Sequence, residues 1–344
     1  MKKFSVLILT DHRSHSSDNS LYALGSTLRK HRKIARVDVA SRGNPANNVF
    51  FYQHQSTELQ AWPLKQEMAF DSMAHRFMNH TVTVDARDYD WIWLRLPRPI
   101  PQGFFTFLDK AIGENRIFNR PSGIEATSTK AFLLNFPEWC PPMHMCHTLE
   151  DIWQAQERYP VVLKPLQSYG GQGIVKADKG FIYENRRRFT FEQYLPLLQQ
   201  QLHAGGYLAM QYLRNVRQGD KRIIVVNGEL IGAVLRMPPK GSWLCNAAQG
   251  GQAMEAQADE RELEITRRLT DALAPRGVVM FGLDTLVDNQ GRRTLSEVNT
   301  LSIGGIKPME DITGKPVIKR VVNILTSYMA EEENQKRPNA VSSK

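Results

Sequence analysis

The first hundred residues alternate between short apolar runs and an amphipathic segment, which predicts a sheet flanked by helices. Phe4–Leu9 is a continuous apolar run, as expected of a buried parallel strand. A polar loop then leads to a helix that we expect Asp18 to cap, with leucines every three or four residues on one face. Asp90–Leu94 is predicted as another buried strand, and Arg95 follows it. Ligands of open α/β sheets bind at such C-terminal strand ends.

Residues 41–80 have no clear periodicity, and the sequence alone does not assign elements to them. Asn119–Gly123 carries the strongest boundary signal of the chain. Thr127 or Ser128 is expected to cap a following helix with Lys130 in its first turn. The polar stretch after Met329 is predicted to be frayed.

Two strand-like runs, Val278–Leu286 and Arg293–Asn299, flank a polar turn and predict a β-hairpin. With the turn centred on residues 289 and 290, antiparallel pairing places Asp284 opposite Glu297. Glu297 and Asn299 share a face because successive strand residues alternate. Two carboxylates and a carboxamide then converge, which suits a hard cation such as Mg²⁺. The alternative is a hairpin whose polar face simply meets water.

A lysine-bearing strand and a glycine-rich loop indicate a phosphate site. Tyr159–Pro165 is an apolar strand with Lys164 in its interior, where a lysine needs an anionic partner. The following loop contains Gly170 and Gly171, and its backbone N–H groups can face phosphate oxygens. A hairpin with a flexible tip is the alternative.

Later segments supply further candidates. Tyr207–Leu213 is an apolar strand, and Asn227-Gly228 marks a tight hairpin turn. Charged residues at the strand ends near this hairpin are expected to be solvated; they are Asp220, Lys221, Arg222 and Arg236. Asp259 and Glu262 fit a capping box at the start of a helix. Its core stripe is predicted to consist of Leu263, Thr266, Leu269 and Leu273.

Composition narrows the class of protein. The 344 residues are 42% hydrophobic and 23% charged, as in a globular enzyme of one large unit or two domains. There is no run of eighteen apolar residues and no signal-peptide core, so we expect a cytoplasmic protein without a membrane span. Three cysteines form no disulfide framework. The net charge of +9 suits anionic substrates, and because the basic residues are scattered we expect no nucleic-acid partner.

Taken in order, these segments resemble the ATP-grasp fold and, within it, the bacterial glutathione synthetase family. The resemblance is carried by VVLKPLQSYGG, QGDKRIIVVNGE, CNAAQGGQ, FGLD and LSEVN over about residues 160–300, and more faintly by Asp18-Asn19-Ser20, Arg95 and Asn119-Arg120-Pro121. It implies an α/β (α+β) protein with a Rossmann-like pre-ATP-grasp domain in residues 1–120. The ATP-grasp domain would span residues 121–330, with a hinge near 210–213, and residues 331–344 would be a flexible tail.

The resemblance also implies roles for individual residues. The nucleotide residues would be Lys130, Lys164, Gly170, Gly171, Met210, Gln211, Tyr212, Leu213 and Asp220. The metal residues would be Asp284, Glu297 and Asn299. Arg222 and Arg236 would steady the transferred phosphate and the substrate carboxylate, and Asn246 would belong to the loop that closes over the reaction. On the substrate side we expect Ser20, Arg95, Gly304 and Gly305.

The implied reaction is ATP-dependent ligation of a carboxylate to an amine through an acyl phosphate. The implied cofactors are ATP and Mg²⁺, with Mn²⁺ as the alternative metal, and the expected partners are small molecules and further copies of the chain in a dimer or tetramer. The substrate segments depart from the family: Thr300–Ile306 replaces a serine-proline-threonine run, Leu244 replaces an arginine, and Leu96-Pro97-Arg98 replaces a charged pair. Glutathione synthesis, ligation of other amino acids or peptides, and a catalytically silent nucleotide-binding regulator therefore stay open.

Overall fold

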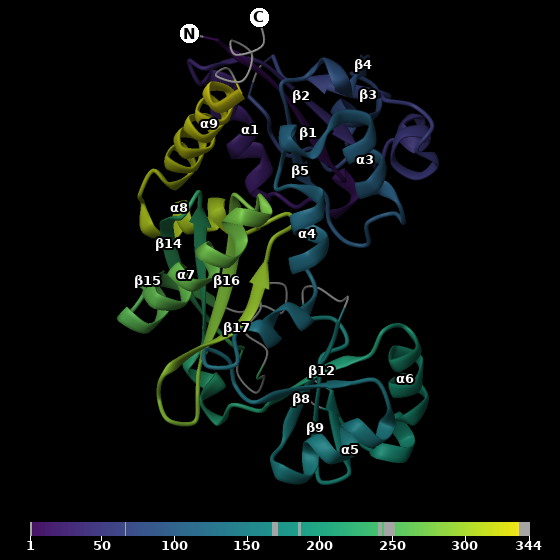
Figure 1. The fold of residues 1–344 in the computed structure, drawn as a ribbon, viewed down its shortest axis with the longest axis vertical. Helices are drawn as coiled ribbons and strands as arrows, with labels where there is room; N and C mark the ends of the chain where they lie inside the picture. Colours follow the sequence, from purple (N-terminus) through teal and green to yellow (C-terminus); the bar gives the residue numbers. More distant parts are fainter. Residues whose placement is uncertain are drawn as a thin grey trace, which may run out of the picture.

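Three β-sheets follow one another along the sequence (Figure 1). The computed structural model describes residues 2–65, 67–166, 171–184, 187–239, 243 and 252–336. Sheet A has the strand order β4-β3-β2-β1-β5-β6, sheet B β11-β10-β9-β8-β12-β7, and sheet C β15-β14-β13-β16-β17. In Figure 1, sheet A lies at the top, sheet C in the middle and sheet B at the bottom. Within the described residues, no helix is both long and apolar enough to cross a membrane.

Sheet A is the predicted α/β unit. Its strands are β1 (Phe4–Thr10), β2 (Ile34–Ser41), β3 (Glu58–Pro63), β4 (Val82–Asp85), β5 (Trp91–Arg95) and β6 (Ile117–Phe118). β1 pairs in parallel with β2 and β5, and β3 and β4 add an antiparallel edge. The accompanying helices are α1 (Ser20–Lys30), α2 (His75–Met78) and α3 (Phe104–Ile112). The carboxyl ends of β1 and β5 carry Thr10 and Arg95 side by side, at the edge where a ligand was expected.

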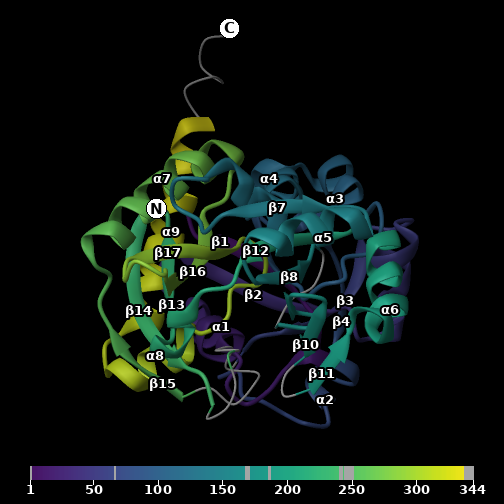
Figure 2. The ribbon, with the colours of Figure 1, turned by 90° about the horizontal axis from the view of Figure 1, so that it is seen from below.

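Sheet B is antiparallel and carries its helices α5 (Leu149–Arg158) and α6 (Phe191–His203). Its strands are β7 (Met143–Cys146), β8 (Val161–Pro165), β9 (Val175–Asp178), β10 (Phe181–Glu184), β11 (Arg187–Thr190) and β12 (Tyr207–Gln211). Both helices begin in capping boxes, at Thr148 and Thr190, and bury apolar residues against the strands. Figure 2 shows sheets B and C on opposite sides of the molecule when it is seen from below.

Sheet C is covered on both faces. Its strands are β13 (Asp220–Val226), β14 (Glu229–Met237), β15 (Gln252–Ala256), β16 (Met280–Val287) and β17 (Arg293–Asn299). On one face α7 (Glu260–Leu273) packs against Ile223, Phe281 and other inward residues. On the other face α8 (Ile306–Thr313) and α9 (Val317–Lys336) pack between the sheet and the α1 side of sheet A. α9 therefore joins sheets A and C.

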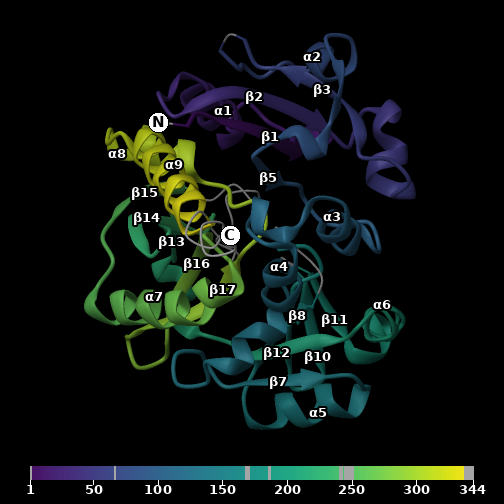
Figure 3. The same cartoon turned by 45° about the horizontal axis from the view of Figure 1, so that its top comes forward.

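A short link between sheets A and B is fixed to sheet C. Helix α4 (Pro121–Thr127) lies between sheets A and B (Figure 3). The Asn119 amide nitrogen donates to the carbonyls of Met280 and Thr300 at 2.5 and 2.7 Å, and its oxygen accepts from the N–H groups of Val279 and Met280 at 2.8 Å. The predicted boundary segment is thus held by buried hydrogen bonds to the third sheet. The remaining short helical segments are η1 (His12–Ser14), η2 (Pro45–Asn47), η3 (Val49–Gln53), η4 (Ala86–Asp88), η5 (Glu114–Arg116), η6 (Lys130–Asn135), η7 (Arg214–Gln218) and η9 (Ala274–Arg276).

Several local predictions were wrong. Asn19, and not Asp18, caps α1, because its side chain accepts from the N–H of Leu21. Lys130 begins a 3-10 segment that follows Thr129, with no side-chain cap from Thr127 or Ser128. The chain after Met329 is not frayed at once, since α9 continues to Lys336 and Glu333 in its last turns pairs with Lys2 at 3.1 Å.

The predicted stripe of α7 was wrong at one position. Leu263 is 50% exposed, and Ile265 is buried in its place with Thr266, Leu269 and Leu273. The capping box of Asp259 and Glu262 that begins this helix is confirmed.

Candidate functional site

The β16–β17 hairpin brings the predicted metal-ligating side chains together. Asp284 pairs with Glu297 as expected from the turn, and a bulge follows between Asp284 and Thr285. Asp284 is almost fully buried, whereas Glu297 and Asn299 are half-buried. The predicted pairing of Asp284 with Glu297 on this hairpin is therefore confirmed.

Both carboxylate oxygens of Asp284 are bonded to arginines of the neighbouring hairpin. Arg222 lies opposite Asp284 in the sheet and donates from Nε to Oδ1 and from Nη2 to Oδ2, the latter at 2.8 Å. Arg236 Nη2 lies 3.1 Å from Asp284 Oδ1 and donates to Asp220 Oδ2 at 2.6 Å, while Arg236 Nε donates to Asp220 Oδ1 at 2.7 Å. The expectation that these charges are solvated was wrong: Asp220 and Arg236 are buried, because two arginines and two aspartates neutralise each other inside the sheet.

The electrostatics of this cluster keep Asp284 ionised. Burial opposes its charge, but the attraction of Arg222 and Arg236 is stronger and lowers the pKa of Asp284 to about 2. Burial and the nearby Asp284 charge raise the pKa of Asp220. Asp284 is consequently the permanent anion of the cluster.

The donor set of the hairpin fits a hard divalent cation. Carboxylate and carboxamide oxygens are the ligands that such cations prefer. The Asn299 amide nitrogen is buried and has no partner among the described residues, so this side chain is not held by the surrounding protein through its N–H groups. Within the described residues no three His, Cys, Asp or Glu side chains could hold a metal together. A cation here would need Asn299 or a ligand phosphate to complete its shell.

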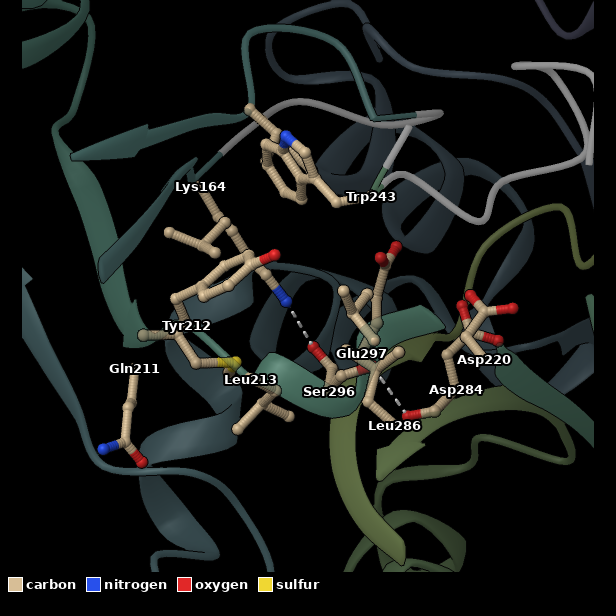
Figure 4. A pocket seen from close by; sticks show the side chains of 14 residues that line it. Lys164, Gln211, Tyr212, Leu213, Asp220, Trp243, Asp284, Leu286, Ser296 and Glu297 are labelled. Atoms are coloured by element: carbon tan, nitrogen blue, oxygen red, sulfur yellow. Dashed lines mark hydrogen bonds between the residues drawn. The ribbon is translucent and has the colours of Figure 1, made fainter. Parts of the chain in front are cut away.

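A cavity between sheets B and C contains most of the predicted nucleotide residues (Figure 4). Lys164 is 8% exposed and donates to the carbonyl of Ser296 at 3.0 Å, and Ser296 Oγ donates to the carbonyl of Asp284 at 3.0 Å. Burial lowers the pKa of Lys164, while the Glu297 charge raises it. The strand lysine therefore points at the carboxylate hairpin from the opposite sheet.

The rest of this cavity is largely apolar. Val162 and Ile174 pack with Tyr212 and Trp243, whose rings are perpendicular at 6.1 Å. Trp243 lies above Tyr212 in Figure 4. An apolar cavity lined by aliphatic and aromatic side chains can hold a purine ring. The complete lining consists of Val162, Lys164, Ile174, Met210, Gln211, Tyr212, Leu213, Val216, Asp220, Trp243, Asp284, Leu286, Ser296 and Glu297.

A second, more polar cavity of about 170 Å³ lies next to the first. It is lined by the loop after β5, by Lys130 and its neighbours, and by Glu297 to Ser302. Burial lowers the pKa of Lys130 to about 8, although the Glu297 charge raises it. Glu297 lines both cavities, and Lys130 and Lys164 approach it from either side.

The predicted substrate residues cluster beside the second cavity rather than in its lining. Arg95 Nη1 donates to the carbonyl of Ile303 at 2.8 Å, and its buried Nε has no partner among the described residues. Burial lowers the pKa of Arg95 to about 10. Ser20 Oγ accepts from the N–H of Lys307 at 3.0 Å. Gly304 and Gly305 lie between these two contacts, and Gly305 has a φ of 90° before α8.

Some candidates fall outside the described residues, and others were missed. Gly170 and Asn246 lie outside them, and Gly171 is described with a φ of 78° but does not line either cavity. The sequence reasoning missed Val162, Ile174, Trp243, Leu286 and Ser296 in the first cavity and Arg98 and Thr129 in the second. Strand alternation could have indicated Val162, because it shares a face with Lys164.

Comparisons with known proteins agree on one family. The sequence model described as "Prokaryotic glutathione synthetase, ATP-grasp domain" matches residues 129–314. The glutathione synthetase of Prochlorococcus marinus (strain MIT 9313) is 31% identical over 243 residues, which are 68% of this chain and 74% of that protein. The glutathione synthetase of Parasynechococcus marenigrum is 30% identical over 248 residues, which are 70% of this chain and 76% of that protein.

Solved structures share the fold at low sequence identity. D-cycloserine synthetase DcsG has a TM-score of 0.63 at 15% identity and covers 94% of this chain and 100% of its own. D-alanyl-alanine synthetase A from Vibrio cholerae has a TM-score of 0.56 at 13% identity and covers 94% of this chain and 99% of its own.

Proposed function

The chain belongs to the prokaryotic glutathione synthetase family, has the ATP-grasp fold and is an ATP-dependent C–N ligase, and we propose that it joins γ-glutamylcysteine to glycine. The products would be glutathione, ADP and phosphate. The observation that carries this proposal is the position of Glu297, which lines both the apolar cavity and the polar cavity. A group at this junction can act on the γ-phosphate and on the acceptor carboxylate at once.

In this proposal the apolar cavity holds ATP. The base lies between Val162 and Ile174 on one side and the hinge residues Met210–Leu213 on the other, with Trp243 above Tyr212. Asp220 faces the ribose side of the cavity. Lys164 and Lys130 offset the phosphate charge, since both are buried cations beside a single carboxylate.

Asp284, Glu297 and Asn299 would hold Mg²⁺, with Mn²⁺ as the alternative. A cation held by these residues would supply positive charge that offsets the negative charge of the phosphates during phosphoryl transfer. Arg222 and Arg236 hold Asp284 in place and lie where they can also donate to the transferred phosphate. The roles predicted for Gly170 and Gly171 over the phosphates, and for Asn246 in the closing loop, stay predictions.

The reaction has two balanced steps. A substrate carboxylate oxygen attacks the γ-phosphorus, and the bond to the ADP oxygen breaks. The amine nitrogen of the second substrate then attacks the acyl carbon, loses a proton, and displaces phosphate as the amide forms. Arginine and lysine side chains stabilise the charges of both transition states, and a closed cavity limits hydrolysis of the acyl phosphate.

A second function of the same fold is ligation of other amino acids or peptides. The observation that favours it is the substrate side, where Gly304-Gly305 and Pro97-Arg98 stand in place of the family residues. The presence of all three predicted metal-ligating side chains on one hairpin counts against a silent regulator. The homo-oligomeric state and the cytoplasmic location stay predictions.

The test is ADP release with Mg²⁺, ATP, γ-glutamylcysteine and glycine, with each component omitted in turn. We expect ADP only when both substrates are present, and none from the Asp284→Ala/Glu297→Ala double variant. If ATP protects the wild-type protein against heat but no ADP forms, the proposed substrates are wrong and a panel of amino acids and dipeptides follows. If ATP with Mg²⁺ gives no thermal shift, the nucleotide site itself is wrong.

A further inference from the structure

The polar cavity is lined by a cation, Arg98, in addition to the predicted phosphate-binding lysine Lys130. Arg98 lines this cavity together with Lys130 and lies close enough to contribute to lowering the Lys130 pKa. Lys164 acts on Lys130 in the same direction from the other side. The Glu297 charge acts on both Lys130 and Lys164. Two cations, Arg98 and Lys130, therefore line the polar cavity, and Glu297 is the one acid in its described lining.

Arg98 has no acidic partner among the residues that the structure describes. Its Nη2 donates to the carbonyl of Ser128 at 3.2 Å and to the Ser128 hydroxyl, both neutral groups. The side chain is half-buried, and burial lowers its pKa. Arg42, on the same side of the molecule, differs because it is paired with Asp11 at 2.8 Å. A half-buried guanidinium without a carboxylate is stabilised by an anionic ligand.

The backbone that carries Arg98 is held rigidly. Arg42 donates from Nη1 to the carbonyl of Pro99 at 2.6 Å and from Nη2 to the carbonyl of Pro97 at 3.1 Å, so the residues on both sides of Arg98 are fixed. Arg42 is itself 6% exposed and held by Asp11. A side chain presented from a fixed loop loses less conformational entropy when it binds a ligand.

Arg98 also marks the passage to an outer cavity of about 270 Å³. Arg98 and Thr129 line both cavities, and the outer one continues along Ile100, Phe105 and Glu125. Glu297 and Asn299 lie in the inner cavity, whereas Arg98 does not line the apolar cavity. Arg98 is thus placed for the part of a substrate that points away from the nucleotide.

We propose that Arg98 binds a substrate carboxylate that is not phosphorylated and thereby selects substrates with a second anionic group. The inference rests on the proposed function, in which both substrates are amino-acid-like. The carboxylate would come either from the γ-glutamyl end of the acyl donor or from glycine. A planar guanidinium can donate to one carboxylate from Nη1 and Nη2 together, and a neutral amide cannot replace this bidentate pair. Nη2 has two N–H groups, so it can keep its bond to Ser128 at the same time.

The test compares carboxylate and carboxamide substrates in the wild-type protein and in Arg98→Gln. The probes are γ-glutamylcysteine against its α-carboxamide analogue at the γ-glutamyl residue, and glycine against glycinamide. The wild type should prefer one carboxylate over its amide by about 10- to 100-fold in kcat/KM, because a hydrogen bond to a charged group is being removed. Arg98→Gln should lose about the same factor with that carboxylate and no longer discriminate it from the amide. Its KM for ATP should stay within about twofold.

Two further variants separate binding from a structural role. Arg98→Lys keeps the charge but not the fork and should retain part of the discrimination. Arg87→Leu removes an exposed arginine paired with Asp85 and should leave every ratio unchanged. The probe whose discrimination disappears identifies the source of the carboxylate. The inference is overturned if Arg98→Gln prefers each carboxylate over its amide by the same factor in kcat/KM as the wild type, for both substrates.

Failure of the proposed substrates is a separate outcome. It shows as no ADP release by the wild-type protein with γ-glutamylcysteine and glycine. The same carboxylate-to-amide comparison is then made with the pair that does support ADP release, and Arg98 is tested there by the same ratio.

Discussion

The two cavities that meet at Glu297 are built from different kinds of structure. The apolar cavity takes its walls from strands β8, β12, β16 and β17 of sheets B and C, and its lining is mostly aliphatic and aromatic. The polar cavity takes most of its walls from the loop at 96–98, the segment at 128–133 and the chain after β17, together with the last residues of β17. Strand walls are fixed by pairing on both sides, whereas loop walls can vary without disturbing a sheet. The apolar cavity thus suits the invariant nucleotide, and the polar cavity suits a substrate that differs between ligases.

The largest expected effect is the loss of activity when a carboxylate is removed where the two cavities meet. Stability measurements on the same variants separate a role in the reaction from a role in holding the fold. Glu297→Ala should lower kcat/KM for ADP release by about 1000-fold, because a charged ligand at the phosphoryl-transfer site is lost. Its free energy of unfolding should change by about 1 kcal/mol or less, since the side chain is half-buried. Asp284→Ala should lose similar activity and also about 3–5 kcal/mol of stability, because buried Arg222 and Arg236 lose their shared partner. Kinetics and urea unfolding of both variants measure the difference, and equal stability losses would contradict it.

A smaller effect tests the apolar cavity alone. Lys164→Met should raise the KM for ATP by about 100-fold, because a buried ammonium facing the phosphates is replaced by an apolar chain. The KM values of the other two substrates should change much less. Lys110→Met, on the exposed face of α3, is the matched control. An unchanged ATP affinity in Lys164→Met would exclude this lysine from the phosphate site.

The pH dependence distinguishes the lysine of the polar cavity. Lys130 has a pKa of about 8, so it is protonated below that pH and neutral above it. We expect kcat/KM for ATP to fall by about fivefold between pH 8 and pH 9 as the phosphate-binding charge is lost. Bound phosphate stabilises the charged form, so kcat at saturating ATP should fall only at higher pH. Lys130→Arg should remove the step near pH 8, and its persistence in that variant would assign the step to another group.

The smallest effect concerns the aromatic cover of the apolar cavity. Trp243→Ala should weaken ATP binding by about 5- to 10-fold, because one face of the base loses an aromatic contact. Trp243→Phe should retain most of the affinity but lose the change in tryptophan fluorescence on ATP binding. Trp153→Phe, remote from the cavity on α5, should keep that change. A fluorescence change that survives in Trp243→Phe would show that this residue does not meet the nucleotide.

Local patterns predicted the elements that carry the metal site. The Asp284–Glu297 pairing followed from the turn position and the two-residue period of strands. The Asn227-Gly228 hairpin followed from turn chemistry, since both residues have positive φ values of 48° and 77°. The burial of Lys164 followed from an apolar strand with one lysine in it. The prediction was wrong for α7, where Ile265 replaces Leu263 in the stripe, because the neighbouring sheet decides which helical positions are covered.

By itself the sequence determined which residues pair within a hairpin, which carboxylates share a strand face and which lysine is buried. These properties depend on residues a few positions apart, so backbone geometry is sufficient to specify them. Only the tertiary structure decided that Trp243 meets Tyr212, that Arg236 reaches both aspartates, and that Arg98 faces the cavity of Lys130 and Glu297. Those contacts join loops and strands that have no common period and are distant in the chain. Their partners are selected by the packing of three sheets, which is a property of the whole molecule.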